Sequence, residues 1–212
     1  ASAKRHKIVP LAYLAGGQPM IFLLSFVSGG LTSLALPPAG FMAALCAFAL
    51  PLSAASTAQS PFRSALLLWC GAWGYFSVSL YWLGSALFAG PEIFVWLLPL
   101  VCLGLPAFIA LFWAVPGYIA VKLASTPMMR LVLIILGLGI SEYLRTILFT
   151  GFPWNAPAQI VMASETISQS AAYIGQHGLN FVMFMIMGAV VCLYQRRGKA
   201  VLFFITPAIL VF

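Results

Sequence analysis

The sequence predicts an all-α polytopic membrane protein, a bundle of about seven transmembrane helices with a cytoplasmic N-terminus. Of its 212 residues, 63% are hydrophobic and only 6% are charged, and the mean hydropathy is +1.08. This composition lies outside the range of soluble globular domains. Four long runs, residues 8–62, 64–91, 93–121 and 166–195, contain no Asp, Glu, Lys or Arg. Since a membrane-spanning helix needs about 20 apolar residues, these runs can supply several crossings.

Prolines and polar turns divide these runs into seven predicted segments. Pro37-Pro38 ends the first segment, since proline cannot continue a helix, and Pro91 suits the start of the fourth. Within the fourth segment, Pro99, Pro106 and Pro116 predict kinks. We therefore predict that the whole chain, 1–212, is a single transmembrane domain. Its segments cover about residues 12–36, 39–56, 64–88, 92–123, 127–150, 176–194 and 199–212.

Lysine and arginine residues predict the orientation of the chain. They occur before the first segment and in the connections that follow the second, fourth and sixth segments. An alternating path puts all these sites on one side of the membrane, and the other connections contain no Lys or Arg. Because cytoplasmic loops carry the excess of basic residues, we expect a cytoplasmic N-terminus. Their spread over helix ends also argues against a nucleic-acid partner. The residues concerned are Lys4, Arg5, Lys7, Arg63, Lys122, Arg130, Arg196, Arg197 and Lys199.

The connection 151–175 is the longest and is predicted to lie on the outer side. It mixes aromatic, polar and small residues. One interpretation is an interfacial loop in which Phe152 and Trp154 anchor at headgroup level. The other is a partly re-entrant loop, which is possible at membrane depth only where protein or water satisfies its backbone. The sequence leaves both interpretations open.

Glu142 and Arg145 stand out in the fifth segment. Glu142 lies 12 residues beyond Arg130, which is about 18 Å along a helix and past the middle of a core about 30 Å thick. An ionisable residue at that depth is costly and rarely accidental, and Arg145 follows at i+3, within pairing reach. The two residues form either a self-neutralising ion pair or a polar niche in the outer leaflet. In such a niche Arg145 faces a lipid phosphate, and Trp154 and Asn155 form the roof.

The remaining reactive residues form no catalytic constellation. His177 and Asn180 begin the sixth segment, and we expect His177 to be a hydrogen-bonded structural residue, since no acid or nucleophile accompanies it. Motifs of hydrolases, zinc enzymes and phosphate-binding loops do not occur. We therefore predict no catalytic residue, metal ligand or cofactor in this chain. The four cysteines all lie in apolar runs and are expected to be small buried hydrophobic residues: Cys46, Cys70, Cys102 and Cys192.

Three stretches carry a family resemblance. "SEYLRTILFTGFPW", residues 141–154, matches the pattern E-[FWY]-L-R-x-x-[LIV]-[LF]-T-G-F-P-W. "GAWGYFSVSLYWLGSAL", residues 71–87, is similar to an aromatic third helix, and "YIGQHGLNF", residues 173–181, is similar to the motif G-x-x-G-L-[SN]-F. Together they resemble the bacterial apolipoprotein N-acyltransferases, and the resemblance covers essentially the whole chain.

The resemblance implies an enzyme of the bacterial inner membrane with eight helices and a periplasmic nitrilase-like domain between helices seven and eight. Such enzymes move an acyl chain from a phospholipid donor to the diacylglyceryl-cysteine of an apolipoprotein acceptor. They use a thioester on a nitrilase-domain Cys, assisted by a Glu and a Lys. Because no residue here matches these three, we expect the membrane half of the enzyme, inactive alone, with the catalytic domain following residue 212. The lipid bilayer is the third expected partner, and the loop 151–175 is expected to be periplasmic.

Two other functions stay open from the sequence. A small transporter or channel could use Glu142 and Arg145 as a polar gate, and the coding sequence beyond Phe212 would distinguish it from the enzyme. A purely structural membrane subunit is favoured if both residues can be replaced by Leu without consequence.

Overall fold

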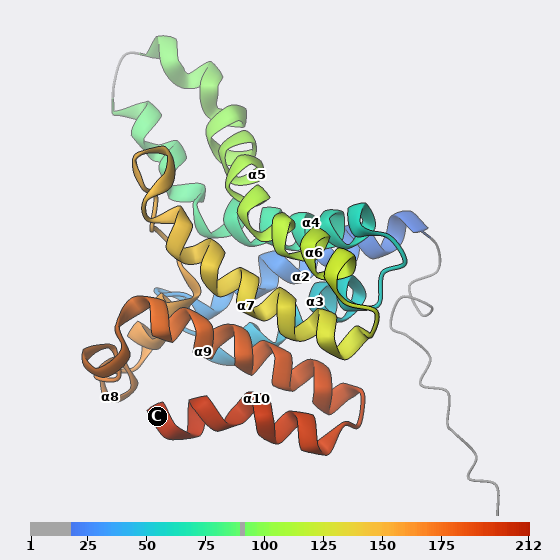
Figure 1. The fold of residues 1–212 in the computed structure, drawn as a ribbon. Coiled ribbons are helices and arrows are strands. Elements are labelled where there is room, and N and C mark those ends of the chain that lie inside the picture. The colour runs from blue at the N-terminus through green and yellow to red at the C-terminus, as the bar shows by residue number, and fades with distance from the viewer. Residues whose placement is uncertain (1–17, 90–91) are drawn as a thin grey trace, which may run out of the picture.

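A computed structural model describes residues 18–89 and 92–212, and every regular element within these ranges is helical (Figure 1). The α-helices are α2 (Gln18–Thr32), α3 (Ala49–Ser56), α4 (Pro61–Ser79), α5 (Leu105–Ile109), α6 (Leu111–Leu123), α7 (Pro127–Arg145), α8 (Glu165–Ser168), α9 (Ala171–Tyr194) and α10 (Gly198–Val211). The 3-10 turns are η1 (Ser33–Ala35), η2 (Met42–Phe48), η3 (Tyr81–Phe88), η4 (Glu92–Leu97), η6 (Leu148–Thr150) and η7 (Pro157–Ala163), and η5 (Leu100–Gly104) is π-helical. The predicted all-α class is confirmed for these residues.

Fewer helices than expected are long enough to cross a membrane. The helices with suitable length and composition are Phe94–Leu123, Pro127–Arg145 and Ala171–Tyr194, and α4 with η3 adds a fourth if this pair, bent by 45°, is one span. The shorter apolar helices are Pro19–Ala35, Met42–Ser56 and Gly198–Val211. These three fall below the length of about 20 residues that a straight crossing needs. The start of the first predicted segment, with Lys4, Arg5 and Lys7, lies outside the described residues.

The fifth predicted segment ends earlier than the sequence indicated. We expected a helix over 127–150, but α7 ends at Arg145. The chain then turns through Phe149, Thr150 and Gly151, whose φ angles are 52°, 72° and 83°. These angles lie in the left-handed region, which a right-handed helix cannot include. The apolar pattern of residues 147–149 had suggested more helix, yet these side chains are exposed.

The fourth predicted segment is irregular, as its prolines indicated. It contains the 3-10 turn η4, the π-helical turn η5 after Pro99, and a break between α5 and α6 four residues beyond Pro106. Pro116 lies inside α6 without ending it. Proline at this position leaves the carbonyl of Phe112 without its helical donor, and the Ser141 hydroxyl of α7 donates to that carbonyl at 2.7 Å. A neighbouring helix thus satisfies the backbone group that the proline frees.

Ser141→Ala is therefore expected to lower the free energy of unfolding by about 1–2 kcal/mol, because the partly buried carbonyl of Phe112 loses its donor. Unfolding of the purified protein in mixed micelles measures the change. Thr206→Ala is the matched control, since its hydroxyl donates at 2.6 Å to the Leu202 carbonyl within its own helix α10. That control should change stability by less than about 0.5 kcal/mol. Equal losses in the two variants would contradict the role given to Ser141.

The helices α2 and α4 approach each other at backbone distance. A Cβ atom added at Gly29 would lie 1.8 Å from the Gly71 carbonyl oxygen, and one added at Gly74 would lie 1.9 Å from the Phe26 carbonyl oxygen. Only glycine fits at these two positions. Small residues at helix contacts let the backbones approach closely in membranes. The chain segments that follow α2 and α4 are thereby held side by side.

The connections that carry basic residues lie at one end of the bundle (Figure 1). Arg130, at the start of α7, donates to the carbonyls of Ala124 and Ala58, both at 2.9 Å, and so joins the connection before α7 to the one before α4. The turn from α9 to α10, which contains Arg196 and Arg197, lies at the same end, and α8 lies at the opposite end. This arrangement agrees with the alternating path predicted from the sequence.

Candidate functional site

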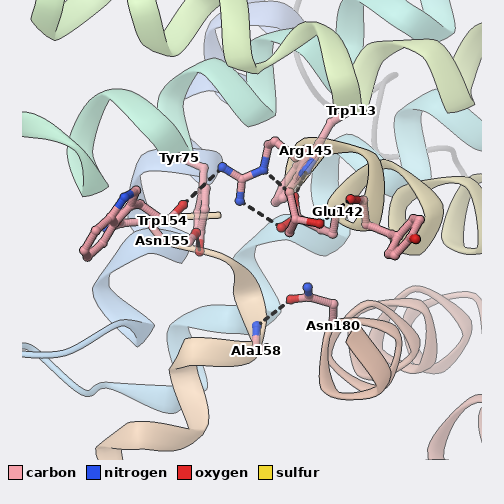
Figure 2. Close-up of polar contacts among 10 residues, drawn as sticks. Tyr75, Trp113, Glu142, Arg145, Trp154, Asn155, Ala158 and Asn180 are labelled. Atoms are coloured by element: carbon pink, nitrogen blue, oxygen red, sulfur yellow. Dashed lines mark hydrogen bonds and ion pairs between the residues drawn. The ribbon is translucent and has the colours of Figure 1, made fainter. Parts of the chain in front are cut away.

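The candidate site is built around an ion pair at the end of α7. Arg145 and Glu142 lie one helical turn apart, and each side chain is only 1% exposed. The Nη2 atom of Arg145 lies 2.8 Å from Oε2 of Glu142, and its Nε atom lies 3.2 Å from Oε1 (Figure 2). This two-point contact fixes the guanidinium in one orientation.

The third guanidinium nitrogen binds the loop. Nη1 of Arg145 donates to the Trp154 carbonyl at 3.1 Å, and the guanidinium carbon lies 4.9 Å from the centre of the Phe76 ring. The loop also folds back onto the end of α7, because the Phe152 amide donates to the Arg145 carbonyl at 2.8 Å. Arg145 is thus turned inward and engaged by protein, as the first of the two interpretations left open by the sequence requires.

Aromatic side chains surround the ion pair. The indole of Trp113, on α6, is fully buried and donates to Oε1 of Glu142 at 2.7 Å. It stacks on Tyr75 with ring centres 5.3 Å apart, and it meets Phe48, Phe76 and Phe184 edge-on. Every polar atom of the Glu142 carboxylate therefore has a partner in an apolar enclosure. This geometry favours the self-neutralising ion pair over a niche that is open to lipid.

Trp154 and Asn155 connect the buried pair to the surface. Asn155 has a φ of 54°, its side-chain amide donates to the Ser79 carbonyl at 2.9 Å, and its carbonyl accepts from the Tyr75 hydroxyl at 3.0 Å. The Trp154 side chain is 55% exposed and meets Trp82 edge-on at 5.9 Å. The backbone of these two residues is held from inside, while the indole of Trp154 lies outside.

A groove of about 560 Å³ opens beside Trp154 and Asn155. Its walls come from the segment after α2, from the junction of α4 and η3, and from the loop that contains η7. None of the described residues that line it is acidic or basic. The groove is lined by Ser33, Leu34, Leu36, Pro37, Pro38, Ala39, Val78, Ser79, Tyr81, Trp82, Trp154, Asn155, Gln159 and Met162. It thus offers aromatic and apolar surface with a few neutral polar groups.

The loop 151–175 combines features of both interpretations that the sequence left open. Ala156, Ala158 and Val161 are buried, and the Ala158 amide donates to Oδ1 of Asn180 on α9 at 2.8 Å (Figure 2). Protein therefore covers this part of the loop, as a re-entrant path requires. The exposed Trp154 side chain is what an interfacial anchor would present.

Two expectations for the other reactive residues were wrong. His177 is exposed and makes no hydrogen bond within the described ranges; its ring packs edge-on to Tyr143 at 5.2 Å. Cys46 is exposed, because it lies on the outward side of the 3-10 turn η2, and Cys102 is only half-buried, whereas Cys70 and Cys192 are buried as expected. Across residues 18–89 and 92–212, no group of three or more His, Cys, Asp or Glu side chains could hold a metal ion.

The sequence reasoning missed the partners of the ion pair. Trp113 and Tyr75 come from α6 and α4, and no spacing along the chain connects them to Glu142 or Arg145. The one signal in the sequence was the aromatic content of residues 71–87, which include Tyr75.

Comparison with known proteins identifies relatives of this chain. Residues 28–189 match the family model described as the apolipoprotein N-acyltransferase N-terminal domain. The chain is 39% identical over 187 residues to the apolipoprotein N-acyltransferase of Rhizobium rhizogenes, a match that covers 84% of this chain and 35% of that protein. It is 35% identical over 200 residues to the protein of that name from Brucella melitensis, with 88% and 38% covered. For Allorhizobium ampelinum the identity is 37% over 186 residues, with 83% and 35% covered. The chain therefore spans little more than a third of the length of these relatives.

Proposed function

Because the chain belongs to the apolipoprotein N-acyltransferase family, through its N-terminal domain, we propose that it is the membrane portion of an acyl-transferring enzyme. The reaction moves an acyl chain from a phospholipid to the diacylglyceryl-cysteine at the N-terminus of bacterial lipoproteins. The family match over residues 28–189 carries this proposal. The nucleophilic Cys and its assisting Glu and Lys have no counterpart here, and we assign them to the region of the relatives that this chain does not span.

We further propose an arrangement in the bacterial inner membrane with seven crossings, a cytoplasmic N-terminus and a periplasmic loop 151–175. The starts of α4 and α7, which contain Arg63 and Arg130, lie at one end of the bundle with the turn from α9 to α10, which contains Arg197 (Figure 1). This supports the orientation, since basic residues mark cytoplasmic connections. Local thinning of the bilayer, together with snorkelling of flanking polar side chains, would accommodate the shorter helices.

In this arrangement, the groove is the lipid-facing feature of the chain. It lies at the end without basic connections, and the exposed rings of Tyr81, Trp82 and Trp154 are of the kind that sits at headgroup level. We propose that Trp154 and Asn155 contact the lipid substrate there. Glu142 and Arg145 do not line the groove and support these two residues from inside the protein. A transporter gate would need this pair to be reachable from a passage, and 1% exposure of both side chains argues against it.

The function is tested with the full-length protein in proteoliposomes. A phospholipid with a labelled acyl chain and a diacylglyceryl lipopeptide with a free α-amino group are supplied, and label on the lipopeptide is measured over time. Transfer is expected with the full-length protein, whereas an N-acetylated lipopeptide should receive no label. The chain 1–212 alone should also transfer none. Absence of transfer by the full-length protein would contradict the proposed reaction.

Trp154→Ala is expected to lower the rate of transfer in the full-length protein about tenfold at sub-saturating phospholipid. That change corresponds to the loss of about 1.4 kcal/mol of binding free energy, and it should shrink when the donor is saturating. Trp96→Ala is the matched control, because Trp96 is 73% exposed on η4 and does not line the groove. A loss of the same size in both variants would show that the groove has no special role.

A further inference from the structure

We infer that Glu142, Arg145 and Tyr75 are positioning residues that set the shape of the groove from inside the protein, an inference that rests on the proposed lipid role of the groove. None of the three is among the described residues that line it. They act on it through two consecutive carbonyls, those of Trp154 and Asn155.

The Trp154–Asn155 segment is bound by two helices. Arg145 of α7 donates to the carbonyl of Trp154 at 3.1 Å, and Tyr75 of α4 donates to the carbonyl of Asn155 at 3.0 Å. The Asn155 side chain adds a third bond, to the Ser79 carbonyl at the end of α4. Because both donors are almost completely buried, water cannot readily replace them if the segment moves. The segment is therefore locked between α7 and α4.

The segment and the turn that leads to it both need such support. Phe149, Thr150 and Asn155 have φ angles of 52°, 72° and 54°. Side chains with a Cβ atom disfavour this left-handed region, and such residues persist where the surroundings over-determine them. Arg145 holds the turn twice, since its carbonyl accepts from the Phe152 amide and its guanidinium donates to the Trp154 carbonyl.

Glu142 determines where the guanidinium points. Its two oxygens accept from Nε and Nη2 of Arg145, which leaves Nη1 directed at the Trp154 carbonyl. The Trp113 indole in turn fixes the carboxylate at 2.7 Å. A lysine at position 145 could contact the carboxylate or the carbonyl, but its single ammonium lacks the planar fork that reaches both in this geometry.

The consequence for the groove follows from the neighbours of the segment. Asn155 and Trp154 both line the groove, and the Trp154 ring meets the ring of Trp82, another lining residue, at 5.9 Å. If the backbone of Trp154 and Asn155 is released, this wall is no longer fixed. Substrate binding should then weaken, although no residue that touches the substrate has changed.

Hydrogen exchange of the full-length protein tests the positioning role without any assay of activity. The reporter is the peptide 149–157, whose Phe152 amide is bonded to the Arg145 carbonyl. Tyr75→Phe removes only the hydroxyl and keeps the ring that stacks on Trp113. We expect exchange in 149–157 to become at least tenfold faster in this variant and in Arg145→Lys, with α9 unchanged. Tyr143→Phe, which alters a half-exposed tyrosine outside the network, should match the wild type. Unchanged exchange in both test variants would overturn the inference.

Steady-state kinetics then separate positioning from general damage. Tyr75→Phe should raise the KM for the phospholipid donor about fivefold and change kcat less than twofold. Loss of folded protein would instead lower kcat at constant KM. Faster exchange with an unchanged KM would overturn the link to the groove. If the full-length protein transfers no acyl chain at all, the proposed function fails, while hydrogen exchange still decides whether these residues hold the loop.

Discussion

Arg145→Ala is expected to lower the free energy of unfolding by about 3–5 kcal/mol, because it leaves the carboxylate of Glu142 buried without its counter-charge. The pair is 1% exposed on both sides, so solvent cannot take over the role of the guanidinium. The Trp154 carbonyl also loses its donor. Unfolding of the purified protein in mixed micelles, followed by tryptophan fluorescence, measures the loss.

The double variant Glu142→Leu with Arg145→Leu should recover most of this stability. Replacing both members of a buried ion pair with apolar residues is often neutral or stabilising by about 1–4 kcal/mol. The double variant should nevertheless keep the fast exchange of peptide 149–157, since nothing then holds the Trp154 carbonyl. A stable double variant with wild-type exchange and wild-type transfer would mean that the pair serves only to balance its own charge.

Arg130→Ala is the matched control on the same helix. Arg130 also bridges α7 to a neighbouring connection through carbonyls, but it has no carboxylate partner in the described part of the chain and is only half-buried. Its loss should therefore cost about 1 kcal/mol. If Arg130→Ala and Arg145→Ala are equally damaging, the buried charge is not the cause of the large effect.

The sequence was informative about the pair but not about its surroundings. The i+3 spacing of Glu142 and Arg145 predicted their contact, because residues three apart share one face of a helix. The direction of the guanidinium depends on Trp113, Tyr75 and the loop carbonyl of Trp154, which lie on other elements. Such long-range partners leave no periodic signal in a chain where most residues are apolar.

The ends of the helices, too, were predictable only where their cause is local in the sequence. The predicted starts at residues 64 and 127 lie within three residues of the observed starts of α4 and α7, at Pro61 and Pro127. Proline in the first turn of a helix is a local signal. The end of α7 at Arg145 was missed, because the residues that follow are as apolar as those before. After Arg145 the chain leaves the helix, and the Trp154 carbonyl then accepts a hydrogen bond from the Arg145 guanidinium. This contact outweighs the local preference for helix.

Gly74→Ala is expected to be as damaging as the loss of Arg145, although it adds only one methyl group. The new Cβ atom would lie 1.9 Å from the carbonyl oxygen of Phe26 and 3.1 Å from the backbone nitrogen of Gly30. Both atoms belong to the backbone of α2, so no side-chain rotation can relieve the overlap, and the helices must separate. We expect a loss of at least about 3 kcal/mol, at the upper end of what overpacking causes.

The same change should reach the groove, which gives it a functional readout. Leu34 and Pro37 follow α2, and Tyr81 follows α4, so these groove residues move apart if the two helices separate. Gly74→Ala should therefore raise the KM for phospholipid in whatever fraction of full-length protein remains folded. Gly198→Ala is the control, because nothing lies within 4 Å of a Cβ atom there; it should leave stability unchanged within about 0.5 kcal/mol. If the two glycine variants unfold alike, the backbone contact between α2 and α4 is not what holds this wall of the groove in place.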